Sequence, residues 1–521
     1  MVTRRRFIRG TLAASIALAG GQSAPLAAIA APAADPTKPA GAKKGGTFTL
    51  AKTGAQSEFN PFQLNPGHFA YIRALYNTLV HYDSTLTPQP ELAESWNLTA
   101  DGKALTLKLR QGVKFHSGRE FTADDVKYSL GFGQRDESAT MRPLFNSVTA
   151  LDMPDNYTVT FRFVAPNASA FDLLDTLFIV DKENFADRRK SASGTGPFKL
   201  DKYIPNDHIE FSAFKDYWDR GKPYLDKYVI RDIPDQFALT LNLESGAVDC
   251  VWQPNYLDLV RLKSSGGKFV ADPGFKGANM FDVGINVSVP PLDKKKVRQA
   301  IAWSIDRARF CKTTLQGLTD PTCLIWPPHS WAYFKDLEGK IGYDLDKAKT
   351  LLKEAGVEGG FETEIMTTSQ NFGFLELAQI LQADLKKIGI NAKIANMEMA
   401  QFQNRLQTKR DIQITIHSYG RTNRDPASTL TGAKAWYNDK EGNWTHYVSD
   451  VWDKLRADFQ ATVDQKKREA LARQIQEMAL DECFTIPVAL NQRAWAYGSY
   501  LKGFDHDLDY CPYVDGVWLD K

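Results

Sequence analysis

Apolar residues recur along the chain with two different spacings from residue 46 onward. Alternation at every second position predicts half-buried strands at residues 46–51, 103–115, 157–163, 198–200, 390–394, 411–416 and 484–490. Recurrence at every third or fourth position predicts amphipathic helices at residues 122–130, 297–310, 348–355, 375–388 and 464–480. Thr122 and Asp125 have the spacing of a capping box at the start of the first of these helices. The pattern therefore predicts a mixed α/β protein whose second half is the more helical.

The first thirty residues carry a different pattern, which is typical of an export signal. A basic segment containing four arginines and no acid precedes a short apolar stretch and a small-residue region. The basic segment resembles a twin-arginine signal, and the general secretory route is the alternative. The apolar stretch falls short of the about 20 residues that a membrane anchor needs. We expect residues 1–30 to be a twin-arginine signal peptide and residues 31–45 to be a flexible lead-in.

Composition and charge are those of an ordinary globular protein. Of the 521 residues, 43% are hydrophobic and 24% are charged. The formal net charge is +2, but without the four arginines of the signal the 64 basic residues become 60, against 62 acidic residues. No basic surface is therefore expected for nucleic acid. Among the five cysteines, Cys311 and Cys323 would close the shortest disulfide loop, although spacing alone does not establish the bond.

Motifs of enzymatic chemistry are missing from the sequence. It contains no G-x-S-x-G elbow, no G-x-x-x-x-G-K-[ST] phosphate loop and no H-E-x-x-H zinc pair. The eight histidines are scattered, and a lone strand histidine such as His417 is more often an ordinary polar residue than a metal ligand. We therefore expect no catalytic residue, no metal site, no cofactor and no enzymatic activity.

Five segments, taken in order along the chain, carry a family resemblance. They are residues 98–130, residues 194–200, residues 217–227 with 243–249, residues 297–306, and residues 343–356. The first is the most specific, with Gly-Val-Lys-Phe-His-Ser-Gly followed shortly by Phe-Thr-Ala-Asp-Asp-Val. With these segments the chain resembles the extracellular solute-binding proteins of family 5, the peptide/nickel/opine class that serves ABC importers, over nearly all of residues 46–521.

The resemblance implies an α/β, two-lobed periplasmic-binding-protein-like fold of type II, cluster C, with an additional inserted domain. Domain I would comprise residues 46–79, 187–279 and 484–521, domain II residues 80–186, and domain III residues 280–483. Ligand would bind in the cleft between the lobes. The closed shape would then be stabilised when the ligand contacts both lobes.

The resemblance also implies the function of a periplasmic solute-binding component. It would bind a peptide-like or amino-acid-derived solute, including an acidic one, and deliver it to the permease of an ABC transporter in the inner membrane. We expect a monomer whose other partner is the twin-arginine translocase during export. Oligopeptides, sugars and a metal chelate or haem are alternative ligands within the family. A periplasmic hydrolase or a chaperone is the alternative from another class.

One loop of domain III departs from the pattern of the peptide-binding relatives. Those relatives carry an Asp four residues before a Pro, and its carboxylate pairs with the α-amino group of the ligand. Here the position four residues before Pro426 is Thr422, with Arg421 and Arg424 on either side of it. We hypothesise that Arg421 or Arg424 binds a carboxylate or other anion of the solute, because a guanidinium can bond a carboxylate at two places.

The alternative for both arginines is solvation, or pairing with Asp425 or Asp450. The rest of the expected site consists of other loop residues and of aromatic rings that could stack on the solute. The residues expected to bind ligand are Phe62, Trp252, Tyr419, Arg421, Thr422, Asn423, Arg424, Asp425 and Trp436, with Tyr437 and Trp444 as further ring candidates. Each ring taken alone is more often a core residue than a ligand contact.

Overall fold

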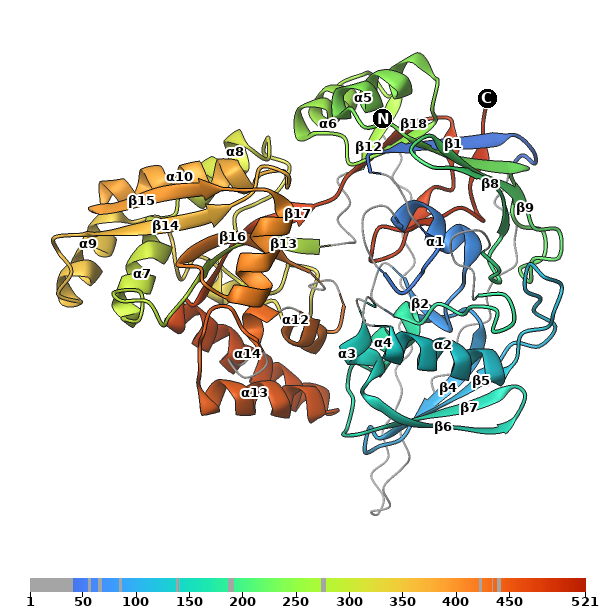
Figure 1. Ribbon diagram of the computed structural model, residues 1–521, viewed down its shortest axis with the longest axis horizontal. Coiled ribbons are helices and arrows are strands. Elements are labelled where there is room, and N and C mark those ends of the chain that lie inside the picture. Colours follow the sequence, from blue (N-terminus) through green and yellow to red (C-terminus); the bar gives the residue numbers. More distant parts are fainter. Residues whose placement is uncertain are drawn as a thin grey trace, which may run out of the picture.

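The computed structural model describes most of the chain after residue 40. The described residues are 41–54, 58–63, 68–83, 87–136, 139, 141–185, 192–272, 278–420, 424–432, 434–437 and 442–521. Among them the chain forms two lobes joined by a narrow connection (Figure 1). The lobe on the right of Figure 1 holds a seven-stranded and a four-stranded sheet, and the lobe on the left holds a five-stranded sheet. The predicted two-lobed α/β architecture is confirmed.

The first lobe is built on the seven-stranded sheet, in the order β12-β18-β11-β1-β10-β9-β8. Its strands are β1 (Thr47–Lys52), β8 (Phe198–Ile204), β9 (His208–Ala213), β10 (Lys227–Asp232), β11 (Cys250–Trp252), β12 (Phe269–Asp272) and β18 (Trp495–Gly498). β1 pairs in parallel with β10 and β11. Phe48 and Leu50 of β1 are fully buried, whereas Thr47 is exposed, as the alternation of the sequence predicts.

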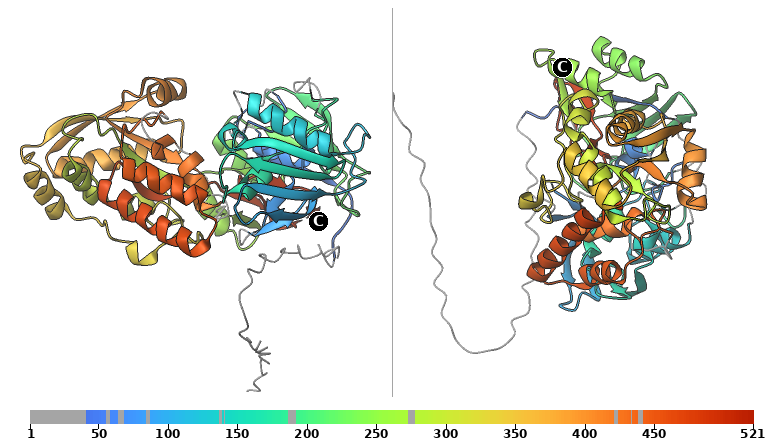
Figure 2. Two further views of the ribbon diagram at one scale, coloured as in Figure 1. Left: turned by 90° about the horizontal axis from the view of Figure 1, so that it is seen from below. Right: turned by 90° about the vertical axis from the view of Figure 1, so that its left-hand side faces the viewer.

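A four-stranded antiparallel sheet, in the order β4-β5-β7-β6, forms an inserted unit of the first lobe. Its strands are β4 (Ala93–Leu98), β5 (Ala104–Leu109), β6 (Val148–Asp155) and β7 (Thr158–Phe163). Helix α2 (Ala123–Arg135) lies across one face of this sheet (Figure 2). The predicted capping box is present at its start, where the backbone N–H of Thr122 donates to the Asp125 carboxylate at 3.0 Å.

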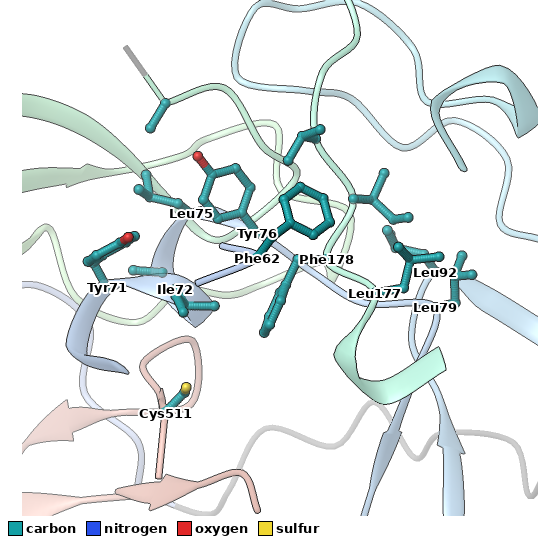
Figure 3. Close-up of a cluster of buried hydrophobic side chains, with 14 of the residues drawn as sticks. Phe62, Tyr71, Ile72, Leu75, Tyr76, Leu79, Leu92, Leu177, Phe178 and Cys511 are labelled. Atoms are coloured by element: carbon teal, nitrogen blue, oxygen red, sulfur yellow. The ribbon is translucent and has the colours of Figure 1, made fainter. Parts of the chain in front are cut away.

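One hydrophobic core joins the seven-stranded sheet to the inserted unit. It extends from Phe48 of β1 and Tyr228 of β10 to Leu105 of β5 and Phe161 of β7. Figure 3 shows its centre, where side chains from distant parts of the chain meet, among them Tyr71, Ile72, Leu79, Leu92, Leu177, Phe178 and Cys511. Because the two sheets share this core, they form one body.

The second lobe is built on the five-stranded sheet, in the order β15-β14-β16-β13-β17. Its strands are β13 (Ala278–Ile285), β14 (Phe361–Thr367), β15 (Ile390–Asn396), β16 (Ile414–Tyr419) and β17 (Thr485–Gln492). β14 is parallel to β15 and β16, and β13 is antiparallel to β16 and β17. Helix α10 (Phe374–Lys387) buries Leu377, Leu381 and Leu385 on the sheet. The core of this lobe is separate from that of the first.

The remaining elements complete the two lobes. In the first lobe they are α1 (Phe69–Leu75), α3 (Arg142–Phe145), α4 (Ala170–Thr176), α5 (Gln236–Ser245), α6 (Tyr256–Lys263) and the strand pairs β2 (Val80–Tyr82) with β3 (Pro88–Pro90), β19 (Leu501–Lys502) with β22 (Trp518–Leu519), and β20 (Asp505–His506) with β21 (Pro512–Tyr513). In the second lobe they are α7 (Lys295–Ser304), α8 (Arg307–Thr313), η1 (Lys335–Leu337), α9 (Leu345–Glu354), α11 (Met399–Gln403), η2 (Asn404–Lys409), α12 (Pro426–Gly432), η3 (Lys434–Trp436), α13 (Asp450–Ala461) and α14 (Gln465–Glu482).

The chain crosses between the lobes twice, between β12 and β13 and again between β17 and β18. The sequence-based division assigned residues 484–521 to the first lobe. β17 instead pairs with β13 along its length, so strand pairing places the second crossing after Gln492. Two lobes with separate core clusters, connected between β12 and β13 and between β17 and β18, are an arrangement that permits hinge motion.

Two further features differ from, or add to, the sequence pattern. The helix predicted over residues 297–310 is broken into α7 and α8, because the Asp306 side chain accepts a hydrogen bond from the backbone N–H of Arg309 and starts a new helix. All five cysteines are buried and none forms a disulfide bond, including Cys311 and Cys323. Within the described residues, no helix combines the length and apolarity needed to cross a bilayer.

Candidate solute-binding site

The central strands of the second lobe separate where they approach the lobe boundary. The parallel strands β14 and β16 pair only at Ile365 with Ile414 and at Met366 with Thr415. From Ile416 to Tyr419, β16 keeps β13 on one side but has no strand partner on its β14 side among the described residues. In α/β sheets, ligands bind in such a crevice at the carboxyl ends of strands.

A cavity of about 380 Å³ occupies this crevice. That volume falls in the range of about 300–1,000 Å³ that is usual for small-molecule sites. Its lining combines aromatic rings with amide, hydroxyl and imidazole groups: Asn371, Phe374, Phe402, Gln403, Leu406, Gln407, His417, Ser418, Tyr419, Gly420, Ala435 and Trp444. No side chain of this described lining carries a formal charge at neutral pH, since burial lowers the pKa of His417 to about 3.

A buried polar pair lies at the side of the cavity. Nε2 of His417 is 3.2 Å from Oδ2 of Asp282, which faces it across the β13–β16 ladder. The same carboxylate accepts a hydrogen bond from the hydroxyl of Thr485. Burial raises the pKa of Asp282 to about 7, because water is excluded from its charged form. Neither imidazole nitrogen has a well-aligned hydrogen-bond partner in the described part of the chain.

Aromatic rings hold this region in place. Trp444 meets the His417 ring edge to face at 4.5 Å. It lies over Gly284 of β13, where an added Cβ would come within 2.1 Å of the indole. Tyr419 is buried, packs edge to face on Trp436 at 5.3 Å, and donates its hydroxyl to the carbonyl of Ile325. Of the rings expected to bind ligand, Tyr419 lines the cavity, and Trp436 packs against the ring of Tyr419.

Arg424 is turned toward the first lobe, where both terminal nitrogens of its guanidinium are paired. Its guanidinium donates two hydrogen bonds to Asp509, at 2.8 and 2.7 Å, and one to Asp175 at 2.6 Å. Burial opposes the charge, but Asp509 and Asp175 outweigh it and raise the pKa of Arg424 well above its usual value. Asp175 also accepts a hydrogen bond from the buried Arg73 at 3.4 Å, so basic and acidic side chains alternate across the contact between the lobes.

The neighbouring residues of the second lobe extend this contact. Asp425 accepts hydrogen bonds from Ser169 of the first lobe at 3.0 Å and from Arg468 of its own lobe at 2.5 Å. The hydroxyl of Ser428 donates to Asp172 of α4. Burial, together with the charge of Asp425, raises the pKa of Asp172 to about 6. Arg424 and Asp425 therefore bind the opposite lobe in this structure.

The remaining predicted residues lie elsewhere. Phe62 is 1% exposed and lies in the core of the first lobe (Figure 3). It packs there against Phe132, Phe145 and Phe185. Trp252 is equally buried between Phe69 and Trp495. Arg421, Thr422 and Asn423 fall outside the described residues. They follow the carboxyl end of β16, so the chain enters them directly from the cavity lining.

Several lining residues were not found from the sequence. Asn371, Phe374, Phe402, Gln403 and Gln407 come from two separate segments, and they meet beside the place where β14 and β16 diverge. One signal was present, since the polar run Thr-Thr-Ser-Gln-Asn at residues 367–371 follows the end of a parallel strand. His417 was interpreted as an ordinary polar residue, and only the tertiary structure shows that its ring nitrogens lack an aligned hydrogen bond among the described residues.

Comparison with known proteins agrees with this architecture. Residues 87–441 match the family described as bacterial extracellular solute-binding proteins, family 5 Middle. The dipeptide-binding protein of Escherichia coli (strain K12) is 30% identical over 85% of this chain and 89% of its own. Heme-binding protein A of Haemophilus influenzae is 27% identical over 90% of this chain and 92% of its own.

Solved structures give the same result. The periplasmic binding protein DppA from Helicobacter pylori, in complex with the peptide STSA, superposes with a TM-score of 0.78 at 27% identity. The match covers 92% of this chain and 99% of that one. The family and the type II, two-lobed fold predicted from the sequence are thereby confirmed. The chain belongs to family 5 of the bacterial extracellular solute-binding proteins, the periplasmic, non-enzymatic components that bind small solutes for ABC importers.

Proposed function

We propose that this protein captures a peptide-like or amino-acid-derived solute and delivers it to its permease by lobe closure. The observation that carries the proposal is the end of β16, which has no strand partner on its β14 side within the described residues and lies beside a polar cavity of the second lobe. An extended solute would add its backbone to this edge as a further strand, and its side chain would enter the cavity. Amides and aromatic rings in the lining suit such a side chain.

The names of the relatives support this class of solute. The relative from Escherichia coli is named for dipeptides, and DppA from Helicobacter pylori holds a tetrapeptide. The relative named for haem is similar at nearly the same identity, so identity alone does not choose between them. Among the described residues there is no group of three or more His, Cys, Asp or Glu side chains placed to hold a metal ion.

An acidic solute would need a cation near the cavity. The charge of Arg424 is already matched by two carboxylates of the first lobe, and the described lining has no cation. The proposal that the protein binds an anionic group therefore rests on Arg421. Arg421 directly follows Gly420 of the lining in the sequence.

Delivery requires that the permease distinguish loaded from empty protein. Closure brings Arg424, Asp425 and Ser428 against the first lobe, and a solute on β16 would add contacts to that same closed shape. We propose that the mature protein acts as a monomer, that the permease recognises the closed lobes, and that the chain is exported by the twin-arginine translocase. The arginine-rich start of the sequence supports the last point.

The test is to identify the solute directly. Native mass spectrometry of freshly purified protein should reveal a retained mass that fits a short peptide or an amino-acid derivative. Isothermal titration calorimetry with dipeptides and with amino-acid conjugates should then give saturable binding, and small-angle scattering should show contraction on binding. Retention of a sugar or of haem, with no binding of any peptide-like compound, would refute the proposal.

A further inference from the structure

His417 is a buried polar side chain that the fold leaves without a complete set of partners. It is 6% exposed and lines the cavity, yet neither ring nitrogen makes a well-aligned hydrogen bond within the described residues. Buried polar groups are nearly always satisfied, because an unsatisfied one loses its hydrogen bonds to water without compensation. A group in the cavity can supply the missing partner.

Asp282 determines which nitrogen is free for that partner. Nε2 is the nitrogen that lies 3.2 Å from the Asp282 carboxylate. The near oxygen of Asp282 already accepts from the Thr485 hydroxyl, so it acts as an acceptor at this point. A neutral imidazole carries one proton, and above the pKa of Asp282, which is about 7, the ionised carboxylate beside Nε2 holds the proton on that nitrogen. The measurements below are therefore made above that pH. Nδ1 is then left with a lone pair and can only accept a hydrogen bond.

The other charged and titratable groups nearby leave this arrangement unchanged. The positive charge of the buried Arg307 favours the ionised form of Asp282. The guanidinium of Arg307 donates its hydrogen bonds to the carbonyls of Pro487 and Ala302. The hydroxyl of Tyr419 donates to the carbonyl of Ile325. Trp444 packs its ring against the imidazole and fixes its orientation.

We infer that the solute donates a hydrogen bond from a side-chain N–H or O–H group to Nδ1 of His417. The inference rests on the proposed peptide-like class of solute and narrows it to side chains that carry a donor. A solute carboxylate at this point would face the lone pair of Nδ1, with the Asp282 carboxylate behind the ring, and would be repelled. The donor-bearing class includes hydroxyl, amide and ammonium side chains.

Matched dipeptides test the contact, because they differ only in the donor. Calorimetry would compare Ala-Thr with Ala-Val and Ala-Lys with Ala-norleucine, each also in the reversed order, so that either residue can reach the cavity. At least one donor-bearing member should bind roughly tenfold more tightly than its isostere, the difference that a single hydrogen bond to a buried group can produce. Binding of both members of every pair with equal affinity would refute the His417 contact while leaving the peptide-like class intact. Failure of all the dipeptides to bind would refute that class and, with it, this contact.

Two variants locate the contact on the ring. In His417→Asn, the amide takes the place of Nδ1, so part of the preference for the donor should remain. In His417→Gln, the amide takes the place of Nε2, so the preference should disappear. Urea unfolding checks that both variants are folded. A preference of wild-type size in His417→Gln would refute the contact.

The protonation state gives an independent readout. Two-bond ¹H–¹⁵N spectra of the histidine-labelled protein, with the His417 signals assigned by their loss in His417→Asn, should show the neutral tautomer with its proton on Nε2. The Nδ1 signal should shift when the preferred dipeptide is added. A proton on Nδ1 in the solute-free protein would overturn the inference, because the solute would then have to accept rather than donate.

Discussion

Arg424 of the second lobe and Asp509 of the first form a two-pronged ion pair across the lobe boundary. The two terminal nitrogens of Arg424 donate to the two carboxylate oxygens at 2.8 and 2.7 Å, and the arginine side chain is fully buried. Because the partners belong to bodies with separate cores, the pair forms only when the lobes are together. Contacts within the chain therefore stabilise the closed arrangement, in addition to any contact with solute.

Arg424→Ala should open the solute-free protein. Removal of the guanidinium takes a cation away from Asp509 and leaves Asp175 with Arg73, and breaking a buried pair from one side costs about 3–5 kcal/mol. Small-angle scattering should show a larger radius of gyration than for the wild type. The matched control is Lys454→Ala on α13, which removes an exposed pair with Asp458 and should change nothing. Equal radii for wild type and Arg424→Ala would show that the pair does not hold the lobes together.

Gly284→Ala should weaken solute binding through Trp444. A Cβ at this position would lie 2.1 Å from two atoms of the indole, so the ring must move and lose its contact with His417. We expect about 1–3 kcal/mol less stability in urea unfolding and an affinity at least about tenfold lower in calorimetry. Gly359→Ala in the same lobe is the control, because a Cβ there meets nothing within 4 Å. Unchanged affinity in Gly284→Ala would show that the position of Trp444 does not matter for solute binding.

Asp172 should make the protein more stable in acid. Its pKa is raised by burial from 3.8 to about 6, so the folded protein holds this proton more tightly than the unfolded chain. The resulting stabilisation is complete below pH 3.8 and is lost as the pH rises through 6. A shift of this size corresponds to about 3 kcal/mol.

The measurement compares wild type with Asp172→Asn across that pH window. The variant keeps the size of the side chain but cannot ionise, so its stability relative to the wild type should rise with pH and then level off above pH 6. Asp282, whose pKa is raised to about 7, titrates in both proteins and cancels in the comparison. A difference in the free energy of unfolding that stays constant with pH would contradict the shifted pKa of Asp172.

Phe62→Ala should reduce stability and leave affinity unchanged. Phe62 was expected from the sequence to contact the solute, but it packs among three other phenylalanines in the first lobe. Truncating a buried phenylalanine costs about 3–5 kcal/mol, which urea unfolding would detect. Phe237→Ala is the control, since that ring is 73% exposed and its loss should cost little. Weakened binding with unchanged stability in Phe62→Ala would support the sequence-based hypothesis instead.

Local pattern was sufficient for much of the fold. The capping box of Thr122 and Asp125 and the alternation of β1 were predicted because each depends on residues within a few positions of one another. The predicted single helix over residues 297–310 was wrong, because the helix cap formed by Asp306 starts a new helix although the apolar periodicity continues through it. The domain bounds implied by the resemblance put residues 484–492 in domain I, whereas β17 pairs with β13 of the second lobe, and periodicity does not show which strand a segment pairs with.

The sequence by itself determined the family, the α/β class and the position of the loop after β16, because ordered motifs and short-range periodicity carry that information. Only the tertiary structure decided what the residues around that loop contact. Arg424 meets Asp175 from 249 positions away, and five side chains of the cavity come together from two segments where two strands diverge. Such contacts depend on how whole lobes and sheets are placed, and no spacing along the chain encodes that placement.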